Sequence, residues 1–305
     1  MHDVVIIGGG PAGLTAGVYA ARGGLKTLIC EEKIIGGQIV LSYEVENYPG
    51  FPQGISGMEL IENFTKQAEK FGVETSYEGV KSIEEDRECK SVYLTNGSCI
   101  KTKTVIIAAG ASANKLGCPG EKKFTGKGVS YCATCDGAFF RNKTVAVIGG
   151  GDSAIEEALY LTNLAKKVYI IHRRDRLRAI KILQDRAVEN KKIEFIFNSV
   201  VKEIQGDKLV NGLLLENRKT KELNRLDIDG VFIYVGVTPN TAFVADMIKL
   251  DENGYIITDD KMETNIEGIY AAGDIRVTPL RQVITAAADG AIAASSAQKY
   301  IESKF

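Results

Sequence analysis

Two cysteines three residues apart, Cys132 and Cys135, are the part of the sequence best suited to chemistry. Such a pair can close a small disulfide and pass two electrons to a partner's disulfide through a mixed disulfide. Zinc is one alternative, but it needs about four ligands, and the chain has no second CxxC and only His2 and His172. A second alternative is that both cysteines are simply buried thiols, but this explanation is weaker for two cysteines that share one face of a helix. We therefore expect a redox-active disulfide and no metal.

An acidic residue, Asp136, directly follows the cysteine pair. An ionised carboxylate beside a thiolate is unfavourable because like charges repel, and half-burial by Phe139 and Phe140 would raise its proton affinity further. We expect Asp136 to carry the proton that the dithiol gains or loses. An aspartate that only caps a helix is the alternative.

The elements that must position these residues follow one plan twice: an apolar strand, a glycine-rich turn, a helix and a second strand. Each copy later closes with another apolar strand that ends in a glycine, Gly110 in the first and Gly236 in the second. The repetition predicts a duplicated, Rossmann-like three-layer α/β fold. The predicted elements are Val4–Ile7, Gly8–Gly13, Leu14–Arg22 and Thr27–Cys30, then Thr144–Ile148, Gly149–Ala154, Ile155–Lys166 and Val168–Ile171.

Both glycine-rich turns have the spacing of a dinucleotide-binding turn. The first glycine makes the bend, the second lets a pyrophosphate approach the backbone, and the third lets helix and strand pack closely. The helix N-terminus then presents free N–H groups to the anion. Plain turns of an α/β protein are the alternative. The predicted contacts are Gly8, Gly10, Pro11, Ala12 and Gly13 in the first turn and Gly149, Gly151, Asp152, Ser153 and Ala154 in the second.

The two copies differ at the end of their second strand. Glu31 lies 23 residues after Gly8, where an acid accepts hydrogen bonds from ribose hydroxyls, so the first site suits FAD or NAD. His172 lies 23 residues after Gly149 and precedes arginines, which can fork onto a 2′-phosphate, so the second site suits NADPH. A solvated charged surface is the alternative. The predicted NADPH contacts here are His172, Arg173, Arg174 and Arg178.

A third feature near the C-terminus is a predicted strand, Thr264–Asp274, that ends in a glycine and an acid. After it, Arg281, Gln282 and Val283 open an alanine-rich helix, whose small residues would let it approach a flat ligand closely. The positive end of that helix would favour the negative charge of a reduced flavin. An ordinary capped helix is the alternative.

These residues resemble the low-molecular-weight thioredoxin reductases of bacteria, which are NADPH-dependent flavoprotein disulfide reductases. The matching motifs occur in the family's order over nearly the whole chain: GGGPAG, GGQ, EVENYPGF, CATCDG, GGGDSA, HRRDRLRA, and YAAGD followed by RQV. The resemblance implies an FAD-binding domain of residues 1–114 and 241–305, into which an NADPH-binding and redox-disulfide domain of residues 115–240 is inserted. Cys118, in LGCPGE, departs from the family pattern, which has an aliphatic residue there.

The resemblance also implies roles for single residues. Cys135 would be the thiol next to the flavin, and Cys132 the thiol that exchanges with oxidised thioredoxin, with its thiolate favoured at a helix N-terminus. Asp136 would be the proton carrier. Rotation about crossings near residues 114–117 and 238–240 would present the disulfide and NADPH in turn to the flavin. Besides the first turn and Glu31, the FAD contacts would be Gly37, Gln38, Asn47, Gly110, Gly273, Asp274, Arg281, Gln282 and Val283.

Composition narrows the partners. The 305 residues carry a formal net charge of −1, so we expect neither nucleic acid nor a membrane as partner. No apolar stretch approaches the roughly 20 residues of a membrane span, and the N-terminal MHDVVIIGGG indicates a first strand and not a signal peptide. We therefore expect a cytoplasmic enzyme, and the resemblance implies a homodimer.

Other functions compete with NADPH-dependent reduction of thioredoxin. A ferredoxin-fed reductase or an oxygen-using dithiol oxidase would have no need of arginines for a 2′-phosphate. The reductase arm of a peroxidase system would normally need an added thiol domain, for which the chain has no spare length. A non-catalytic sensor that binds dinucleotides leaves the cysteine pair without an evident use.

Overall fold

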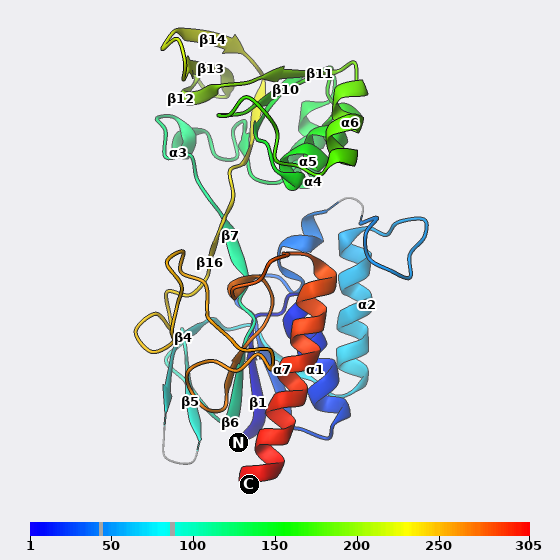
Figure 1. Ribbon diagram of the computed structural model, residues 1–305, viewed down its shortest axis with the longest axis vertical. Helices are drawn as coiled ribbons and strands as arrows, with labels where there is room; N and C mark the ends of the chain where they lie inside the picture. Colours follow the sequence, from blue (N-terminus) through cyan, green and yellow to red (C-terminus); the bar gives the residue numbers. More distant parts are fainter. Residues whose placement is uncertain (43–44, 86–88) are drawn as a thin grey trace. The chain divides into compact units, whose positions relative to one another are not determined.

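The computed structural model describes residues 1–42, 45–85 and 89–305, without the side chains of residues 41, 134 and 135. The described chain divides into two compact units. Unit 1 comprises Met1–Ser112 and Thr238–Phe305, and unit 2 comprises Ala113–Val237. Each unit contains a sheet with a parallel core and helices packed on one face (Figure 1), so the predicted duplicated α/β fold is confirmed.

Unit 1 is built on a mixed sheet. Its strands are β1 (His2–Ile7), β2 (Thr27–Cys30), β3 (Glu74–Ser76), β4 (Val80–Glu85), β5 (Lys90–Leu94), β6 (Cys99–Ile107) and β17 (Ile269–Ala271). The order β3-β2-β1-β6 is parallel, and β17 pairs in parallel with the C-terminal part of β6. Antiparallel β5 pairs with the N-terminal part of β6, and β4 follows it.

Alternate residues of β1 point to opposite faces of this sheet. Val4 and Ile6 join the core beneath the helices, whereas Val5 and Ile7 join a second core on the other face. The helices over the first face are α1 (Pro11–Arg22), α2 (Gly57–Lys70) and α7 (Val283–Lys304). Helices α1 and α7 run side by side (Figure 1), and they approach so closely that a Cβ on Gly290 would lie 2.1 Å from the Ala12 carbonyl oxygen.

Unit 2 repeats the plan with a fully parallel sheet. Its order is β11 (Ile193–Ile196), β10 (Lys167–Ile171), β9 (Thr144–Gly149), β15 (Gly230–Tyr234) and β8 (Val129–Ser130). Helices α5 (Asp152–Thr162) and α6 (Lys181–Glu189) pack on one face with the short α4 (Ala133–Asp136) and η2 (Gly137–Phe140). The other face packs on an antiparallel sheet of β12 (Ser199–Gly206), β13 (Val210–Asn217) and β14 (Leu223–Asp227), and on α3 (Glu121–Phe124).

The chain crosses between the units twice. The crossing segments, β7 (Ala111–Ala113) and β16 (Val237–Pro239), pair with each other as a small sheet. Near the chain ends, Lys103 forms an ion pair with Asp3 at 2.7 Å and lies over the Phe305 ring at 5.4 Å, which places both termini at the same end of unit 1. In the part of the chain that the structure describes, no helix combines the length and the apolar character needed to cross a bilayer.

Some predicted elements have different bounds in the structure. Helix α1 begins at Pro11 and not at Leu14, because a proline in the first turn needs no acceptor for a backbone N–H. Helix α5 spans Asp152–Thr162, so it begins before the predicted Ile155 and ends before the predicted Lys166. The predicted strand 264–274 is wrong for most of its length: β17 covers only Ile269–Ala271, after Gly268 at φ +75°, and Gly273–Ile275 form the 3₁₀ turn η3.

Candidate active site

The first glycine-rich turn leaves space at one glycine and none at two others. Gly8 has φ +108°, and a Cβ there would lie 2.3 Å from the Ala108 carbonyl oxygen. A Cβ on Gly13 would lie 1.9 Å from the Gly8 carbonyl oxygen. Gly10 is open, with nothing nearer than 3.9 Å, and as N-cap of α1 it offers no side-chain acceptor. The free N–H groups at the start of α1 therefore remain for a pyrophosphate.

Glu31 lies directly after β2 and is held beside this turn. Its Oε2 accepts a hydrogen bond from Gly9 N at 2.9 Å, and its Oε1 accepts one from Lys33 N at 2.9 Å. Each carboxylate oxygen has a further lone pair. A fixed Glu31 can therefore also accept hydrogen bonds from ribose hydroxyls.

Segments far apart in the sequence bring other predicted FAD contacts to the same turn. A Cβ on Gly37 would lie 3.6 Å from the Gly10 Cα. A Cβ on Gly273 would lie 2.9 Å from the Ala12 Cβ. Gly110 has φ +62° and would leave a Cβ in open space. Gly37 and Gly273 therefore lie against the first turn, where a side chain at Gly273 would collide with Ala12.

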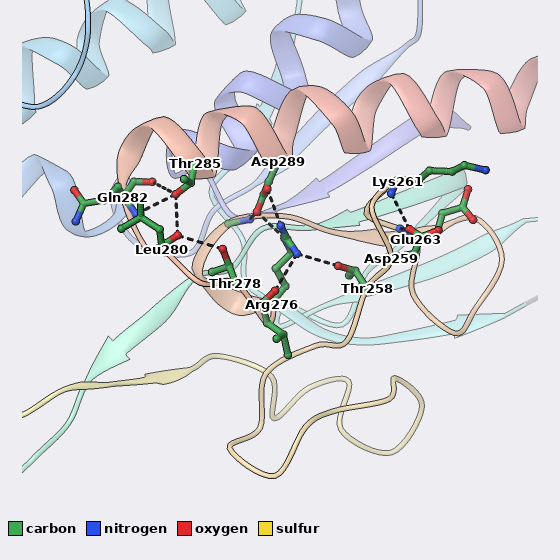
Figure 2. A network of polar contacts seen from close by, with 12 residues as sticks. Thr258, Asp259, Lys261, Glu263, Arg276, Thr278, Leu280, Gln282, Thr285 and Asp289 are labelled. Atoms are coloured by element: carbon green, nitrogen blue, oxygen red, sulfur yellow. Dashed lines mark hydrogen bonds and ion pairs between the residues drawn. The ribbon is translucent and has the colours of Figure 1, made fainter.

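The N-terminus of α7 meets two more of the predicted residues. Gln282 and Thr285 form a capping box (Figure 2), and Val283 is the first helical residue. The Asn47 side-chain amide donates a hydrogen bond to Gln282 Oε1 at 2.9 Å. Gln38 donates its side-chain amide to the carbonyl oxygen of Ala111. The structure thus joins Asn47 to Gln282, which are 235 residues apart in the chain.

Asp274 and Arg281 supply charge near this helix end. Burial raises the pKa of Asp274, the Arg281 guanidinium lowers it, and the Asp289 carboxylate raises it. The Arg281 guanidinium stacks over the Tyr255 ring at 4.1 Å, and its Nε is a buried donor without a partner among the described residues. A half-buried acid and an unsatisfied donor suit a ligand with many hydroxyls, such as the ribityl chain of FAD.

A buried ion pair that the sequence does not predict ties the loop between β17 and α7, here called the Gly273 loop, to α7 (Figure 2). Asp289 accepts hydrogen bonds from Gly273 N at 3.1 Å, from Arg276 Nε at 2.6 Å and from Arg276 Nη2 at 2.9 Å. Arg276 also donates to Thr258 Oγ1 at 3.2 Å. The sequence holds one signal for it, a lone acid in the alanine-rich stretch AAADGAIAA.

The second glycine-rich turn repeats the first in unit 2. A Cβ on Gly149 would lie 2.4 Å from the Tyr234 carbonyl oxygen, and a Cβ on Gly151 would have nothing within 4 Å. Gly151 is the N-cap of α5 and offers no side-chain acceptor. The third position, glycine in unit 1, is Ala154 here. The other predicted contacts form the first turn of α5: Asp152, Ser153 and Ala154.

The loop after β10, which carries the predicted arginines, folds back onto this turn. Arg178 N and Ala179 N donate hydrogen bonds to the Gly150 carbonyl oxygen at 2.6 and 3.1 Å. Ile180 N donates to Asp152 Oδ1 at 2.7 Å. The loop after β10 is therefore fixed to the start of α5 by its backbone, and its side chains remain available.

His172 and three predicted arginines form one cluster there. Burial lowers the pKa of His172, and the positive charges of Arg178, Arg174 and Arg173 lower it further. His172 is buried against Gly150, where a Cβ would lie 2.5 Å from its Nδ1. Arg173, Arg174 and Arg178 are exposed. The structure thus gathers three cationic side chains beside an open dinucleotide turn, as a 2′-phosphate requires.

Cys132 is disulfide-bonded in the structure. The side chain of Cys135 lies outside the described part, so its predicted pairing with Cys132 stays a prediction. Cys132 comes just before α4, a single turn that begins at Ala133, and its carbonyl oxygen accepts hydrogen bonds from Ser130 Oγ at 3.0 Å and Asp136 N at 3.2 Å. Among the described side chains, Cys30, Cys89, Cys99 and Cys118 are free cysteines.

Asp136 is half-buried at the end of α4. It lines a cavity of about 270 Å³ together with Ser130, Phe139 and Phe140. Phe140 is buried and packs edge-on against Phe232, but Phe139 is 73% exposed. The exposed ring of Phe139 therefore offers an apolar surface at the cavity.

Comparisons with known proteins agree with this geometry. The family model described as pyridine nucleotide-disulphide oxidoreductase matches residues 2–290. Thioredoxin reductases from Peptoclostridium litorale and Bacillus subtilis are 49% and 50% identical to this chain, covering 100% and 99% of it and 98% and 95% of their own lengths. A crystal structure of thioredoxin reductase from Lactococcus lactis is 49% identical with a TM-score of 0.96, covering 99% of this chain and 100% of that one.

The chain therefore belongs to the pyridine nucleotide-disulphide oxidoreductase family. Within it, the chain falls among the bacterial thioredoxin reductases, so the resemblance stated from its motifs is confirmed. The protein is an oxidoreductase with FAD and NADPH as its cofactors. The residues around both glycine turns fit these groups, because each turn leaves an open glycine and an uncapped helix N-terminus.

Proposed function

We propose that unit 1 binds FAD, that unit 2 binds NADPH, and that the protein uses their electrons to reduce the disulfide of a thioredoxin. The observation that carries this assignment is the contrast between the two turns. The first ends at Glu31, fixed by two backbone N–H groups as an acceptor for ribose hydroxyls. The second ends at exposed arginines, which suit a phosphorylated ribose.

In unit 1 the residues bind and orient the flavin nucleotide. Gly10 and the start of α1 take the pyrophosphate, Glu31 takes the adenosine ribose, and Asp274 and Arg281 take the ribityl hydroxyls. When bound, FAD supplies two-electron transfer between NADPH and a disulfide. The other proposed FAD contacts are Gly8, Pro11, Ala12, Gly13, Gly37, Gln38, Asn47, Gly110, Gly273, Gln282 and Val283.

In unit 2 the residues bind NADPH and hold the redox pair. Gly151 and the start of α5 take the pyrophosphate, and Arg173, Arg174 and Arg178 take the 2′-phosphate. The paired crossings β7 and β16 are the proposed hinge by which the disulfide and NADPH are presented in turn. The other proposed NADPH contacts are Gly149, Asp152, Ser153, Ala154 and His172.

Cys132 and Cys135 exchange two electrons with the partner. The Cys132 thiolate attacks one sulfur of the partner's disulfide, and the other partner sulfur leaves as a thiolate and takes a proton. The Cys135 thiol then loses its proton and attacks Cys132, which restores the internal disulfide and releases the first partner sulfur to take a second proton. Asp136, half-buried beside the pair, holds the proton in transit. The exposed Phe139 at the cavity beside Asp136 offers the partner an apolar contact.

We further propose, from the family resemblance, a homodimer in the cytoplasm whose partner is neither nucleic acid nor a membrane. The net charge of −1 supports the absence of a nucleic-acid partner, because it gives no field that would attract one. Light scattering coupled to size-exclusion chromatography measures the mass directly. A single-chain mass would contradict the dimer.

Steady-state reduction of a thioredoxin, coupled to a chromogenic disulfide, tests the whole proposal. We expect turnover of the FAD-loaded protein with NADPH, much slower turnover with NADH, and none after Cys132→Ser or Cys135→Ser. The matched control is Cys99→Ser, which alters an exposed free cysteine. Binding of NADPH without any turnover would mean that the protein is a redox sensor and not an enzyme. Turnover with reduced ferredoxin alone would mean that ferredoxin, and not NADPH, supplies the electrons.

A further inference from the structure

Glu157 is a half-buried acid that the proposed exchange does not use. It lies on α5, and its Oε2 atom is buried without a hydrogen-bond partner among the described residues. Burial raises the pKa of Glu157 to about 7, the nearby Glu156 charge raises it too, and a hydrogen bond with Tyr234 lowers it. Near neutral pH its carboxyl group therefore changes charge.

Tyr234 joins this acid to the redox segment. It ends β15, and its hydroxyl oxygen accepts a hydrogen bond from Ala133 N, the residue after Cys132, at 2.8 Å. The Ala133 N–H can only donate, so the Tyr234 O–H points to its other partner, the Glu157 carboxyl group. Burial first, then the Glu157 charge, raises the pKa of Tyr234, so the hydroxyl keeps its proton. The chain of donors therefore runs one way, from Ala133 through Tyr234 to Glu157.

Resting on the proposed function, we propose that Glu157 is a positioning residue for the redox pair, which acts through Tyr234 and offsets the charge of the Cys132 thiolate by binding a proton. Two electrons and one proton convert the disulfide into one thiol and one thiolate. The new negative charge favours neutral Glu157, which takes a second proton from solvent. When the disulfide re-forms, the thiolate charge disappears and Glu157 returns that proton.

The ionisable groups that act on Glu157 and Tyr234 come from three elements. Glu156 lies on the same helix as Glu157, Tyr234 comes from β15, and the Asp136 charge on α4 acts on Tyr234. The carboxylates of Glu156, Glu157 and Asp136 all oppose a thiolate when ionised. Among them Glu157 is the one that Tyr234 connects to the backbone of the redox segment. A neutral Glu157 is thus the state that accommodates the thiolate.

The test is the rate at which iodoacetamide alkylates Cys132 in the FAD-loaded protein after reduction by dithiothreitol, read by mass spectrometry of the Cys132 peptide. Glu157→Gln keeps the size and an acceptor for Tyr234 but has no charge at any pH. At pH 8 ionised Glu157 disfavours the thiolate, so Glu157→Gln should react about threefold to tenfold faster than wild type. At pH 6 Glu157 is mostly neutral, and the two rates should converge.

Two further variants complete the test. Glu189→Gln removes an exposed carboxylate at the end of α6 and should follow wild type at both pH values. Tyr234→Phe removes the donor that favours ionised Glu157, so Glu157 should stay neutral to higher pH and the pH 8 rate should again exceed wild type. Equal pH 8 rates for Glu157→Gln and wild type overturn the proposal, and an unchanged Tyr234→Phe overturns the link through Tyr234. Because this assay uses neither NADPH nor thioredoxin, its failure is distinct from failure of the proposed function.

Discussion

The two glycine-rich turns bring the same backbone groups close together but lead to different residues after the second strand. In each, a Cβ on the first glycine, Gly8 or Gly149, would lie within 2.4 Å of a carbonyl oxygen. In each, the second glycine is open and the N-terminus of the following helix has no side-chain cap. In unit 1 the residue after the second strand is Glu31, whose carboxylate is held in place. In unit 2 it is the buried His172, with exposed arginines around it. The backbone thus suits any dinucleotide pyrophosphate. The residues after the second strand determine whether the site favours an unphosphorylated or a 2′-phosphorylated ribose.

The loops that complete the two sites are also held differently. In unit 1 the Gly273 loop is fixed by a buried ion pair, with Asp289 accepting from Gly273 N and from Arg276. In unit 2 the arginine loop is fixed by backbone N–H groups that donate to Gly150 and to Asp152. A buried charge that loses its partner costs far more than an exposed hydrogen bond to a backbone carbonyl or to a solvated carboxylate. Unit 1 should therefore be the more sensitive of the two to single substitutions.

The third position of the turn gives the largest expected contrast. In Gly13→Ala the new Cβ would lie 1.9 Å from a backbone oxygen that cannot move without opening the turn. We expect a loss of at least about 4 kcal/mol in the free energy of unfolding of unit 1, and protein without bound FAD. Ala154→Gly, at the matching position, should cost only about 1 kcal/mol. Flavin content and denaturant unfolding measure both, and a yellow, stable Gly13→Ala protein would show that the turns are equivalent.

The buried ion pair gives the next largest contrast. Asp289→Asn keeps the shape but leaves the Arg276 charge without its counter-ion, which should cost about 3 kcal/mol and weaken FAD binding. Asp152→Asn in unit 2 keeps an acceptor for Ile180 N and should cost about 1 kcal/mol or less. Thermal midpoints and FAD titration by flavin fluorescence compare the two variants. Equal losses would mean that the ion pair does not set the stability of the Gly273 loop.

The arginines give a contrast in affinity with little change in stability. Replacing both Arg173 and Arg174 with alanine removes two charge-assisted contacts to a 2′-phosphate, which should lower kcat/KM for NADPH by about a hundredfold and leave that for NADH nearly unchanged. Arg176→Ala is the matched control, since Arg176 is exposed in the same loop but outside the predicted set. A parallel loss for both nucleotides would instead point to general damage of the loop.

The sequence predicted well those parts of the molecule whose cause is local. A glycine turn between a strand and a helix has a steric reason that GxGxxG states directly, so both turns and the parallel strands around them were predicted. Helix starts were less accurate, because a periodic apolar pattern does not show that Pro11 or Asp152 already belongs to the first turn. The C-terminal strand was too long because only Ile269–Ala271 find a partner strand in β6.

Contacts between distant segments were beyond the reach of the sequence. The pairing of Arg276 with Asp289, and of Asn47 with Gln282, depends on how α7 packs against the loops around it. Glu157 looked like an ordinary helix acid, because the partner that gives it a role, Tyr234, arrives from a strand more than 70 residues later. The arginine cluster could be predicted because its members are neighbours in the chain.

The smallest expected contrast concerns pH. Because burial and the three arginines lower the pKa of His172 in the folded protein, the unfolded chain binds a proton there first as the pH falls. The stability that comes from neutral His172 is therefore present at pH 7.5 and declines as the pH drops below about 6.5, its unfolded value. In unit 1 burial raises the pKa of the Asp274 acid, and that group acts with the opposite sign: the folded protein protonates it first on acidification.

We expect His172→Gln to flatten the fall of the thermal midpoint between pH 7.5 and pH 5.5, by less than any effect above. Arg176→Ala, which removes an exposed arginine of the same loop that is not among the charges lowering the pKa of His172, should leave the wild-type slope in place. Bound NADP⁺ should reduce the fall of the wild-type thermal midpoint with pH, because a 2′-phosphate offsets the arginine charges that disfavour an imidazolium. In His172→Gln, bound NADP⁺ should leave the pH dependence of the thermal midpoint unchanged. Identical slopes for all three proteins would mean that the imidazole does not sense the arginine cluster, and that the second turn is tuned by the arginines alone.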